Sequence, residues 1–195
     1  AVIKWFDEHG LLDHVEEHDH SVMHCYRCDA ALEPWLSEQW FVAVDKLKGP
    51  ALDAVNSGKV TFHPARWTQT YTTWMENLKD WCISRQLWWG HRIPVFYCED
   101  CGWEDALTED TDVCPKCGGH HVHQDENVLD TWFSSQLWTF ATQGWPQKPE
   151  LLEGHHPTTA RVTARDIIAL WVARMVRSSR YFLDEGPFKD VVTYP

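Results

Sequence analysis

The chain has 195 residues, of which 44% are hydrophobic and thirteen are tryptophan, a composition that excludes a disordered tail. The formal net charge of −12 excludes a general affinity for nucleic acid, because binding to phosphates needs clustered lysine and arginine. No apolar run has the length of a membrane span, so we expect no membrane association. Seven cysteines with paired spacing are typical of a reducing cytosol and predict a cytoplasmic protein. Because the chain starts at Ala1 without an initiator methionine, we expect it to be an internal fragment of a longer protein.

The N-terminal segment combines a short helix with a cysteine pair. Apolar residues recur at helical spacing between Val2 and His9, and Gly10 follows as a stop signal, so we predict a helix there. Cys25 and Cys28 form a Cys-x-x-Cys pair in an acidic loop that is rich in histidine. We interpret these histidines as solvated loop residues, and two thiolates alone do not satisfy zinc. The pair is therefore predicted to be half of a second zinc site, incomplete in this chain.

The next segment alternates helix and strand signals. Pro50 is predicted to be the first residue of a short helix that ends at Gly58. Residues 59–63 alternate as a strand does, and residues 81–84 are typical of a buried strand in a parallel sheet. Four apolar residues between them step by four, three and four, which is more typical of a core-facing helix than of a base-stacking platform: Trp67, Tyr71, Trp74 and Leu78.

Two further Cys-x-x-Cys pairs lie twelve residues apart. They place four thiolates at the ends of two tight turns, a spacing that suits tetrahedral zinc. The alternatives are four unrelated buried thiols or two disulfides. Four protein ligands leave no open position for a substrate, so the predicted metal is structural. The predicted ligands are Cys98, Cys101, Cys114 and Cys117.

A strand end and a helix start are predicted after the second cysteine pair. Residues 128–129 indicate the end of a strand, and Ser134 is a candidate helix cap. Trp132 is expected at the carboxyl edge of the sheet, where open α/β folds bind ligands.

The last part of the chain predicts a strand, a turn and a helix. Residues 161–163 indicate a short strand, and Asp166 to Leu183 is the strongest helix signal in the chain. Thr163 and Asp166 have the spacing of a capping box, although that motif prefers Glu or Gln at its last position. Such a unit is half of a mononucleotide-binding fold, in which the helix start presents backbone amides and a carboxylate. On these residues alone, a plain cap on a buried helix is an equally good interpretation.

Longer runs are more specific than any single element. They are Glu33 to Val42 (EPWLSEQWFV), Trp81 to Pro94 (WCISRQLWWGHRIP) and Glu126 to Trp138 (ENVLDTWFSSQLW). These runs closely resemble the valyl-tRNA synthetases, a branch of the class I aminoacyl-tRNA synthetases, and the similarity extends over essentially all 195 residues.

The resemblance implies an α/β fold. It would comprise part of a Rossmann-type parallel-sheet catalytic domain with a four-cysteine zinc-knuckle insertion, preceded by the tail of the editing domain. Residues 1–40 would be the C-terminal end of the inserted editing domain and a return linker, and residues 41–97 a catalytic-domain segment. Residues 98–124 would form the zinc-knuckle insertion, and residues 125–195 a catalytic Rossmann-type segment with the amino-acid and adenosine site.

The resemblance also implies a pocket for the amino acid. By position, Trp132, Ile167 and Trp171 match residues that shape the family's pocket around the valine side chain. Two indoles and a β-branched residue suit a small branched substrate. One missing methylene is discriminated by only about 1–3 kcal/mol, so such enzymes also need editing.

A nucleotide site is implied next to this pocket. Asp166 matches the carboxylate that accepts the ribose hydroxyls of ATP or the adenylate, and Thr163 and Ala164 match the adjoining turn. Many relatives have glycine where Ala164 stands, so the resemblance does not fix how closely the backbone approaches the nucleotide here.

Enzymes of this family activate valine with ATP and Mg to valyl-adenylate and transfer it to tRNA(Val), which would be the partners of the full-length parent. The His-Ile-Gly-His and Lys-Met-Ser-Lys-Ser motifs and the editing residues of the family are absent from residues 1–195. We therefore expect no catalytic residue in this fragment and no activity of the fragment alone.

Two alternatives remain open. An isoleucyl-type synthetase differs only in the runs at residues 87–91 and 131–135. A zinc-ribbon interaction module would need no catalytic apparatus, but it leaves the run around Trp132 and the helix starting at Asp166 unexplained.

Overall fold

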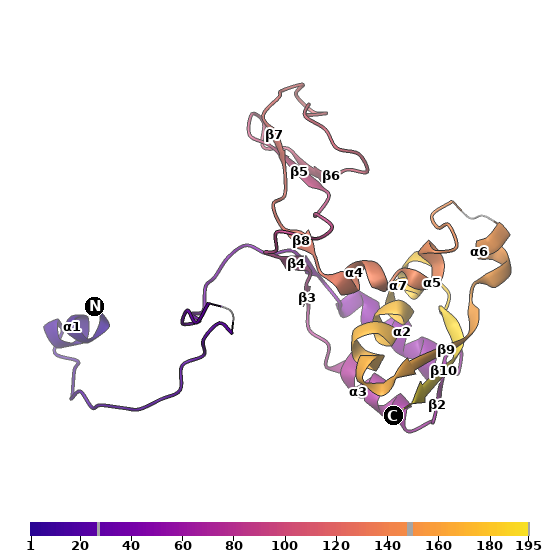
Figure 1. Cartoon of the computed structure of the whole chain (residues 1–195), viewed down its shortest axis with the longest axis horizontal. Helices are drawn as coiled ribbons and strands as arrows, with labels where there is room; N and C mark the ends of the chain where they lie inside the picture. Colours follow the sequence, from indigo (N-terminus) through magenta and orange to yellow (C-terminus); the bar gives the residue numbers. More distant parts are fainter. Residues whose placement is uncertain (27, 148–149, 195) are drawn as a thin grey trace. The chain divides into compact units, whose positions relative to one another are not determined.

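The computed structural model describes residues 1–26, 28–147 and 150–194, and Figure 1 shows the course of the chain. The chain separates into two compact units, residues 1–38 and residues 39–195. Within the described ranges, no helix has both the length and the apolar character needed to cross a membrane.

The described residues of the first unit contain one helix, α1 (Val2–Glu8), which confirms the helix predicted there. None of its residues is buried. Further along, an antiparallel bridge joins His24 to Ala31, on either side of the first cysteine pair.

A three-stranded parallel sheet is the centre of the second unit (Figure 1). Its strands are β2 (Thr61–His63), β10 (Phe188–Tyr194) and β9 (Thr158–Ala164), in the order β2-β10-β9. Both predicted strands in this region are confirmed, and β9 is longer than the three residues expected. Because β9 and β10 are parallel, the chain between them must cross over the sheet, and the segment that does so is helical.

The crossover segment contains three kinds of helix, whereas the sequence predicted one continuous helix from Asp166. A 3₁₀ turn, η1 (Arg165–Ile167), is followed by a π-helical turn, η2 (Ile168–Val172), and by the α-helix α7 (Ala173–Leu183). The predicted capping box does not form, because the first turn has no side-chain cap and Thr163 lies within β9. Such π turns inside helices occur frequently at functional sites.

Two more helices pack on the same core. They are α2 (Asp45–Asn56) and α3 (Trp67–Glu76), and Tyr71 and Met75 of α3 are fully buried against Phe62 and Phe188 of the sheet. The core-facing helix predicted there is confirmed, and burial of each large apolar side chain contributes about 1.5–3 kcal/mol. Pro50 is not the first residue of its helix, because α2 begins five residues earlier and continues through the proline to Asn56.

Two short antiparallel ladders correct the prediction for residues 81–84. β1 (Phe41–Val42) pairs with β3 (Trp81–Cys82), and β4 (Ser84–Arg85) pairs with β8 (Val128–Leu129). The segment is buried as expected, but its partners run antiparallel and it does not belong to the parallel sheet. A short apolar run shows burial and does not show the direction of the neighbouring strand.

The segment with the second and third cysteine pairs forms its own small sheet. Its antiparallel strands are β5 (Val95–Cys98), β6 (Glu104–Ala106) and β7 (Val122–Gln124), in the order β6-β5-β7.

Three short helices follow β8: α4 (Thr131–Ser135), α5 (Trp138–Ala141) and α6 (Glu150–His155). The residue that caps α4 is Asp130, whose carboxylate accepts a hydrogen bond from the Trp132 amide at 2.9 Å. Ser134, the predicted cap, lies within the helix and donates to the Thr131 carbonyl.

Candidate functional site

The four predicted metal ligands lie together. The sulfur atoms of Cys98, Cys101, Cys114 and Cys117 are all within 4.8 Å of one another. The Cys98–Cys117 and Cys101–Cys114 sulfur separations are both 3.7 Å. A tetrahedron with Zn–S bonds of about 2.3 Å has sulfurs about 3.8 Å apart, whereas a disulfide needs about 2.05 Å. The separations therefore fit a tetrahedral metal ion and rule out two disulfides.

Both cysteine turns use the same backbone hydrogen bonds. The Cys98 amide donates to the Trp103 carbonyl at 2.8 Å, and the Gly102 amide donates to the Cys98 carbonyl at 2.9 Å. Cys114 repeats this pattern with residues 119 and 118 at 2.8 and 2.9 Å. The glycine after each pair has a φ of +65° or +73°, a backbone conformation that glycine adopts without a steric cost. The sequence thus builds two matching turns that direct four sulfurs to one point.

The surroundings of the cluster lower the pKa of Cys114 and raise the pKa values of Cys101 and Cys117. Burial raises the pKa of Cys114, but the backbone amides of Cys117 and Lys116 and the neighbouring thiols lower it further, so the pKa falls to about 7. The Gly119 amide, which donates to the Cys117 sulfur at 3.4 Å, lowers the pKa of Cys117, but the neighbouring thiols and burial raise it to about 12. Since metal ligands must be deprotonated, the amides directed at Cys114 and Cys117 assist metal binding and the neighbouring thiols of Cys117 oppose it while no metal is bound.

Cys25 has the same backbone hydrogen bonds in the first unit. Its amide donates to the Ala30 carbonyl, and the Asp29 amide donates to the Cys25 carbonyl, both at 2.9 Å. Asp29 has a φ of +58° and takes the place of the glycine in the other two turns. Among the described residues, no group of three or more potential metal ligands includes Cys25 or Cys28.

Trp171 lies in the π turn and is fixed by two contacts. Its indole N–H donates to the Ser135 carbonyl at 3.0 Å, and the Arg161 guanidinium lies over its ring, 3.6 Å from the centroid. Burial lowers the pKa of Arg161. Nothing in the sequence pattern indicated this stacking, because Arg161 lies ten residues away on β9.

The structure brings the elements with Trp132 and Trp171 into contact. Trp132 is half-buried in the first turn of α4, the same helix whose Ser135 carbonyl binds the Trp171 indole, and α4 packs against η2. Ile167 is half-buried at the end of η1. The expectation that Trp132 follows a strand of the parallel sheet is wrong, because β8 pairs with β4 in a separate ladder.

The predicted nucleotide residues occupy the carboxyl end of β9. Thr163 is buried, and its hydroxyl has no hydrogen-bond partner among the described residues. Ala164 is the last residue of the strand. Asp166 is exposed in the first 3₁₀ turn, with a carboxylate oxygen 3.5 Å from Arg165 Nε. A buried donor without a partner and an exposed carboxylate thus lie at the edge where α/β sheets bind ligands.

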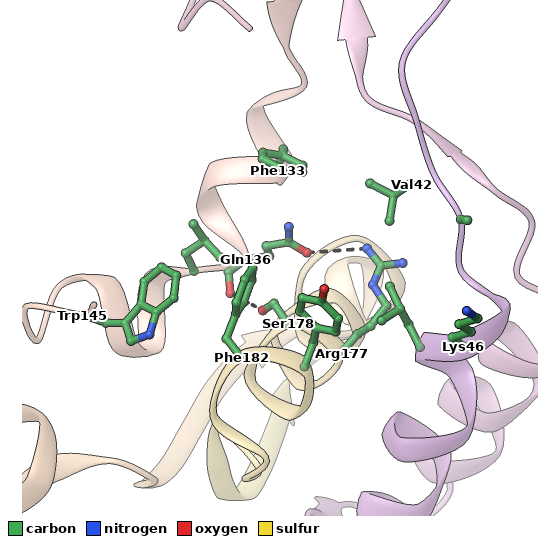
Figure 2. A pocket seen from close by; sticks show the side chains of 12 residues that line it. Val42, Lys46, Phe133, Gln136, Trp145, Arg177, Ser178 and Phe182 are labelled. Carbon is green, nitrogen blue, oxygen red and sulfur yellow. Dashed lines mark hydrogen bonds between the residues drawn. The ribbon is translucent and has the colours of Figure 1, made fainter. Parts of the chain in front are cut away.

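A separate apolar cavity of about 390 Å³ was not indicated by the sequence (Figure 2). The Gln136 side-chain oxygen accepts from Arg177 at 3.5 Å, and the Gln136 carbonyl accepts from the Ser178 hydroxyl at 3.0 Å. None of the predicted site residues lines it. Its lining comes from the end of β1 and the start of α2, from α4 and the residues after it, and from α7: Val42, Ala43, Lys46, Leu47, Phe133, Gln136, Leu137, Trp145, Arg177, Ser178, Tyr181 and Phe182.

Comparison with protein families matches residues 12–194 to the tRNA synthetases class I (I, L, M and V). The chain belongs to this family. It is 52% identical over 190 residues to the valine–tRNA ligase of Thermotoga maritima, covering 97% of this chain and 22% of that protein. It is 55% identical over 185 residues to the valine–tRNA ligase of Carboxydothermus hydrogenoformans, covering 95% of this chain and 21% of that protein. The chain therefore spans about a fifth of the length of these relatives.

A solved structure supports the same fold. The chain is similar to the Mycobacterium tuberculosis methionyl-tRNA synthetase in complex with methionyl-adenylate, with a TM-score of 0.57 and 12% sequence identity. The match covers 88% of this chain and 29% of that chain. At this identity the likeness concerns the fold alone.

Proposed function

We propose that this chain is a segment of a valine–tRNA ligase. In the complete enzyme it would serve the activation of valine with ATP and Mg, followed by transfer of valine to tRNA(Val). The observation that carries this proposal is an identity above 50% to two valine–tRNA ligases over at least 95% of the chain. Under this proposal the parallel sheet belongs to a Rossmann-type catalytic domain, and residues 1–40 are the end of the editing domain with its return linker.

The valine side chain would occupy a slot formed by Trp132, Ile167 and Trp171. Two observations support this assignment: α4 and η2 are in contact, and the Trp171 ring is held from two sides by Ser135 and Arg161. A ring that cannot turn gives the slot a fixed width, and a fixed apolar slot discriminates against side chains that are too large or too polar.

The adenosine would bind at the carboxyl end of β9. Asp166 would accept hydrogen bonds from the ribose hydroxyls, for which its exposed carboxylate is available. Thr163 and Ala164 would form the wall beside the nucleotide, and the unpaired Thr163 hydroxyl is a donor that lacks an acceptor among the described residues. The groups that stabilise the charge on the reacting phosphate would come from other segments of the enzyme.

We further propose that Cys98, Cys101, Cys114 and Cys117 hold a structural zinc ion. The sulfur separations and the amides directed at the sulfurs support zinc, which prefers four thiolates in a tetrahedron. When bound, the metal supplies no chemistry to the reaction and holds the small sheet folded. Cys25 and Cys28 would supply two ligands to a second site whose other ligands lie outside the described residues.

The amino-acid assignment is tested by Trp171→Ala in the full-length enzyme. We expect kcat/KM for valine in the ATP–pyrophosphate exchange reaction to fall, because the slot loses packing and admits water. The corresponding loss of transition-state stabilisation should be at most about 3–5 kcal/mol. The KM for ATP should hardly change. Trp138→Ala is the matched control, since that indole is more than half exposed. An unchanged kcat/KM for valine in Trp171→Ala would contradict the slot.

The nucleotide assignment is tested by Asp166→Ala in the same enzyme. The KM for ATP should rise about tenfold or more, because a hydrogen bond to a charged group contributes about 1.5–3 kcal/mol, and the KM for valine should stay near its wild-type value. Asp53→Ala, which removes an exposed carboxylate from α2, is the control. A rise in the KM for valine alone would overturn the assignment.

A further inference from the structure

Two arginine side chains lie over one tryptophan ring at the start of β3, and a third arginine shares a carboxylate with that ring. The Arg174 guanidinium lies 3.9 Å from the centroid of the Trp81 ring and that of Arg177 lies 5.2 Å from it. Arg85 forms an ion pair with Asp130, and the Trp81 indole N–H donates to the same carboxylate at 3.2 Å. Three guanidinium groups therefore lie close together, and one carboxylate serves them.

Arg174 and Arg177 are buried without a carboxylate of their own. Arg174 is 8% exposed and Arg177 is 3% exposed. Their hydrogen-bond acceptors are the Leu170 carbonyl at 3.2 Å and the Gln136 side chain at 3.5 Å, the second of which is drawn in Figure 2. Among the described residues, neither makes an ion pair. Buried cations in proteins are normally paired, so this arrangement lacks an anion.

Burial and neighbouring positive charges disfavour the charged form of both guanidinium groups. Burial and, to a smaller extent, the charge of Arg174 lower the pKa of Arg177 to about 10, while Tyr71 opposes the change. Burial also lowers the pKa of Arg174, with Asp130 acting in the opposite direction and Arg85 in the same one. An anion bound beside these groups would relieve both effects.

A cavity of about 390 Å³ gives access to these two side chains. Its cationic lining residues are Lys79, Arg85, Arg174 and Arg177. Among the described residues, its one acidic lining residue is Asp80, and one oxygen of that carboxylate already accepts from the Val44 amide at 3.0 Å. The exposed Lys79 and the partly exposed Arg85 lie where a ligand can enter, and the buried pair lies inside.

We propose that this cavity binds a phosphate group. Arg174 and Arg177 contact its oxygens from inside, Lys79 and Arg85 approach from the entrance, and Asp130 keeps Arg85 in position. Guanidinium groups present several N–H donors in a fork that matches phosphate oxygens, and phosphate offers enough acceptors for more than one arginine. The small volume suits the phosphate and one attached group.

The local charge is unusual for this molecule. A chain with a net charge of −12 repels anions over most of its surface, so a cavity with four cationic side chains and one acidic residue is a focused attractive site. None of the residues proposed for valine, adenosine or zinc lines it. The phosphate site and the proposed function therefore rest on different residues and can be tested independently.

The test is a titration of the full-length protein with inorganic phosphate by isothermal calorimetry, at an ionic strength held constant with sodium chloride. Arg177→Met removes the buried charge and keeps an apolar side chain of similar length. Phosphate affinity should fall at least tenfold in this variant and should change less than twofold in Arg66→Met, whose exposed guanidinium lies over Trp67 on α3. Equal phosphate affinity in the wild type and in Arg177→Met would overturn the proposal.

A second variant covers the case in which Arg177→Met does not fold. Lys79→Met changes an exposed side chain at the entrance and should weaken phosphate binding about threefold without altering the melting temperature. Unchanged affinity in Lys79→Met would overturn the proposal when the Arg177 variant cannot be measured.

The same titration distinguishes the source of the phosphate. Adenosine 5′-monophosphate that binds more tightly than inorganic phosphate, and loses that affinity in Lys79→Met, would place the phosphate on a nucleotide. Equal or weaker binding would assign the site to free phosphate. Adenosine without phosphate should not bind there, and adenosine binding that depends on Lys79 would contradict a phosphate site.

Discussion

At the scale of single residues, Asp125 holds together segments that are distant in the sequence. Its carboxylate accepts the Trp40 indole N–H at 2.8 Å, the Tyr97 hydroxyl at 2.9 Å and the Asn127 amide at 2.8 Å. Burial raises its pKa, but the hydrogen bonds from Trp40, Asn127 and Tyr97 outweigh burial, so the pKa is lower than usual. Nothing in the local pattern indicates this role, because the partners lie 28 and 85 residues away.

Asp125→Asn should lower the free energy of unfolding by about 2–3 kcal/mol at pH 7, because four donors, including the Asn127 side-chain amide at 2.9 Å, lose a charged acceptor. Because the pKa of Asp125 is lower in the native state than in the unfolded state, its charged carboxylate stabilises the fold. This contribution is complete at pH values above the unfolded pKa of about 3.9, and it disappears as the pH falls through the native pKa. The difference between wild type and variant should therefore shrink below pH 4. Urea unfolding at several pH values measures it, with the exposed Asp110→Asn as the control. A difference that grows on acidification would contradict this role.

At the scale of elements, we expect the small sheet β6-β5-β7 to depend on the cysteine cluster. Its strands have three or four residues each, and β6 is fully exposed. Such short strands bury too little apolar surface to be stable alone, and small domains of this kind need a metal or a disulfide. The two matched turns bring together four sulfurs that could hold such a metal.

Cys98→Ser should reduce bound zinc from one ion per chain to less than about one tenth and should speed amide exchange in residues 95–124, since structural zinc contributes folding free energy directly. Amides of β9 and β10 should stay protected, because the parallel sheet has its own core. Metal analysis and hydrogen exchange by mass spectrometry measure both effects. Cys82→Ser is the matched control, since Cys82 lies outside the cluster. Unchanged zinc content in Cys98→Ser would contradict the assignment of the cysteine cluster as a zinc site.

The sequence predicted elements better than their arrangement. Periodicity identified α1, α3 and the strands β2 and β9, because side-chain burial follows the helix and strand repeats, but β10 was not predicted. It did not predict the antiparallel partners of β3 and β4 or the π turn at residues 168–172, because both depend on contacts with residues remote in the chain. The metal cluster was predictable because its spacing is local.

At the scale of the molecule, the proposed site residues lie near one edge of the described fold. Thr163 and Ala164 end β9, which is the outer strand of the sheet, and Asp166 follows in η1. Open α/β sheets bind ligands in a crevice outside the carboxyl ends of their strands, and walls on both sides of the crevice contact the ligand. Residues 1–195 supply one of these walls under the proposed function, and a wall can bind a substrate without stabilising a transition state.

The 195-residue chain alone should therefore not catalyse valine-dependent exchange of pyrophosphate into ATP. Formation of an adenylate requires preorganised charges around the reacting phosphate, and removing one such group commonly costs a factor of about 10²–10³ in rate. Under the proposed function, several of these groups come from segments outside residues 1–195. The factors by which the rate falls should multiply, so the exchange rate of the chain should lie below the detection limit. Exchange of labelled pyrophosphate measures this, with the full-length enzyme as the positive control. Valine-dependent exchange by the chain that disappears in Asp166→Ala would show that the reacting groups lie within these residues.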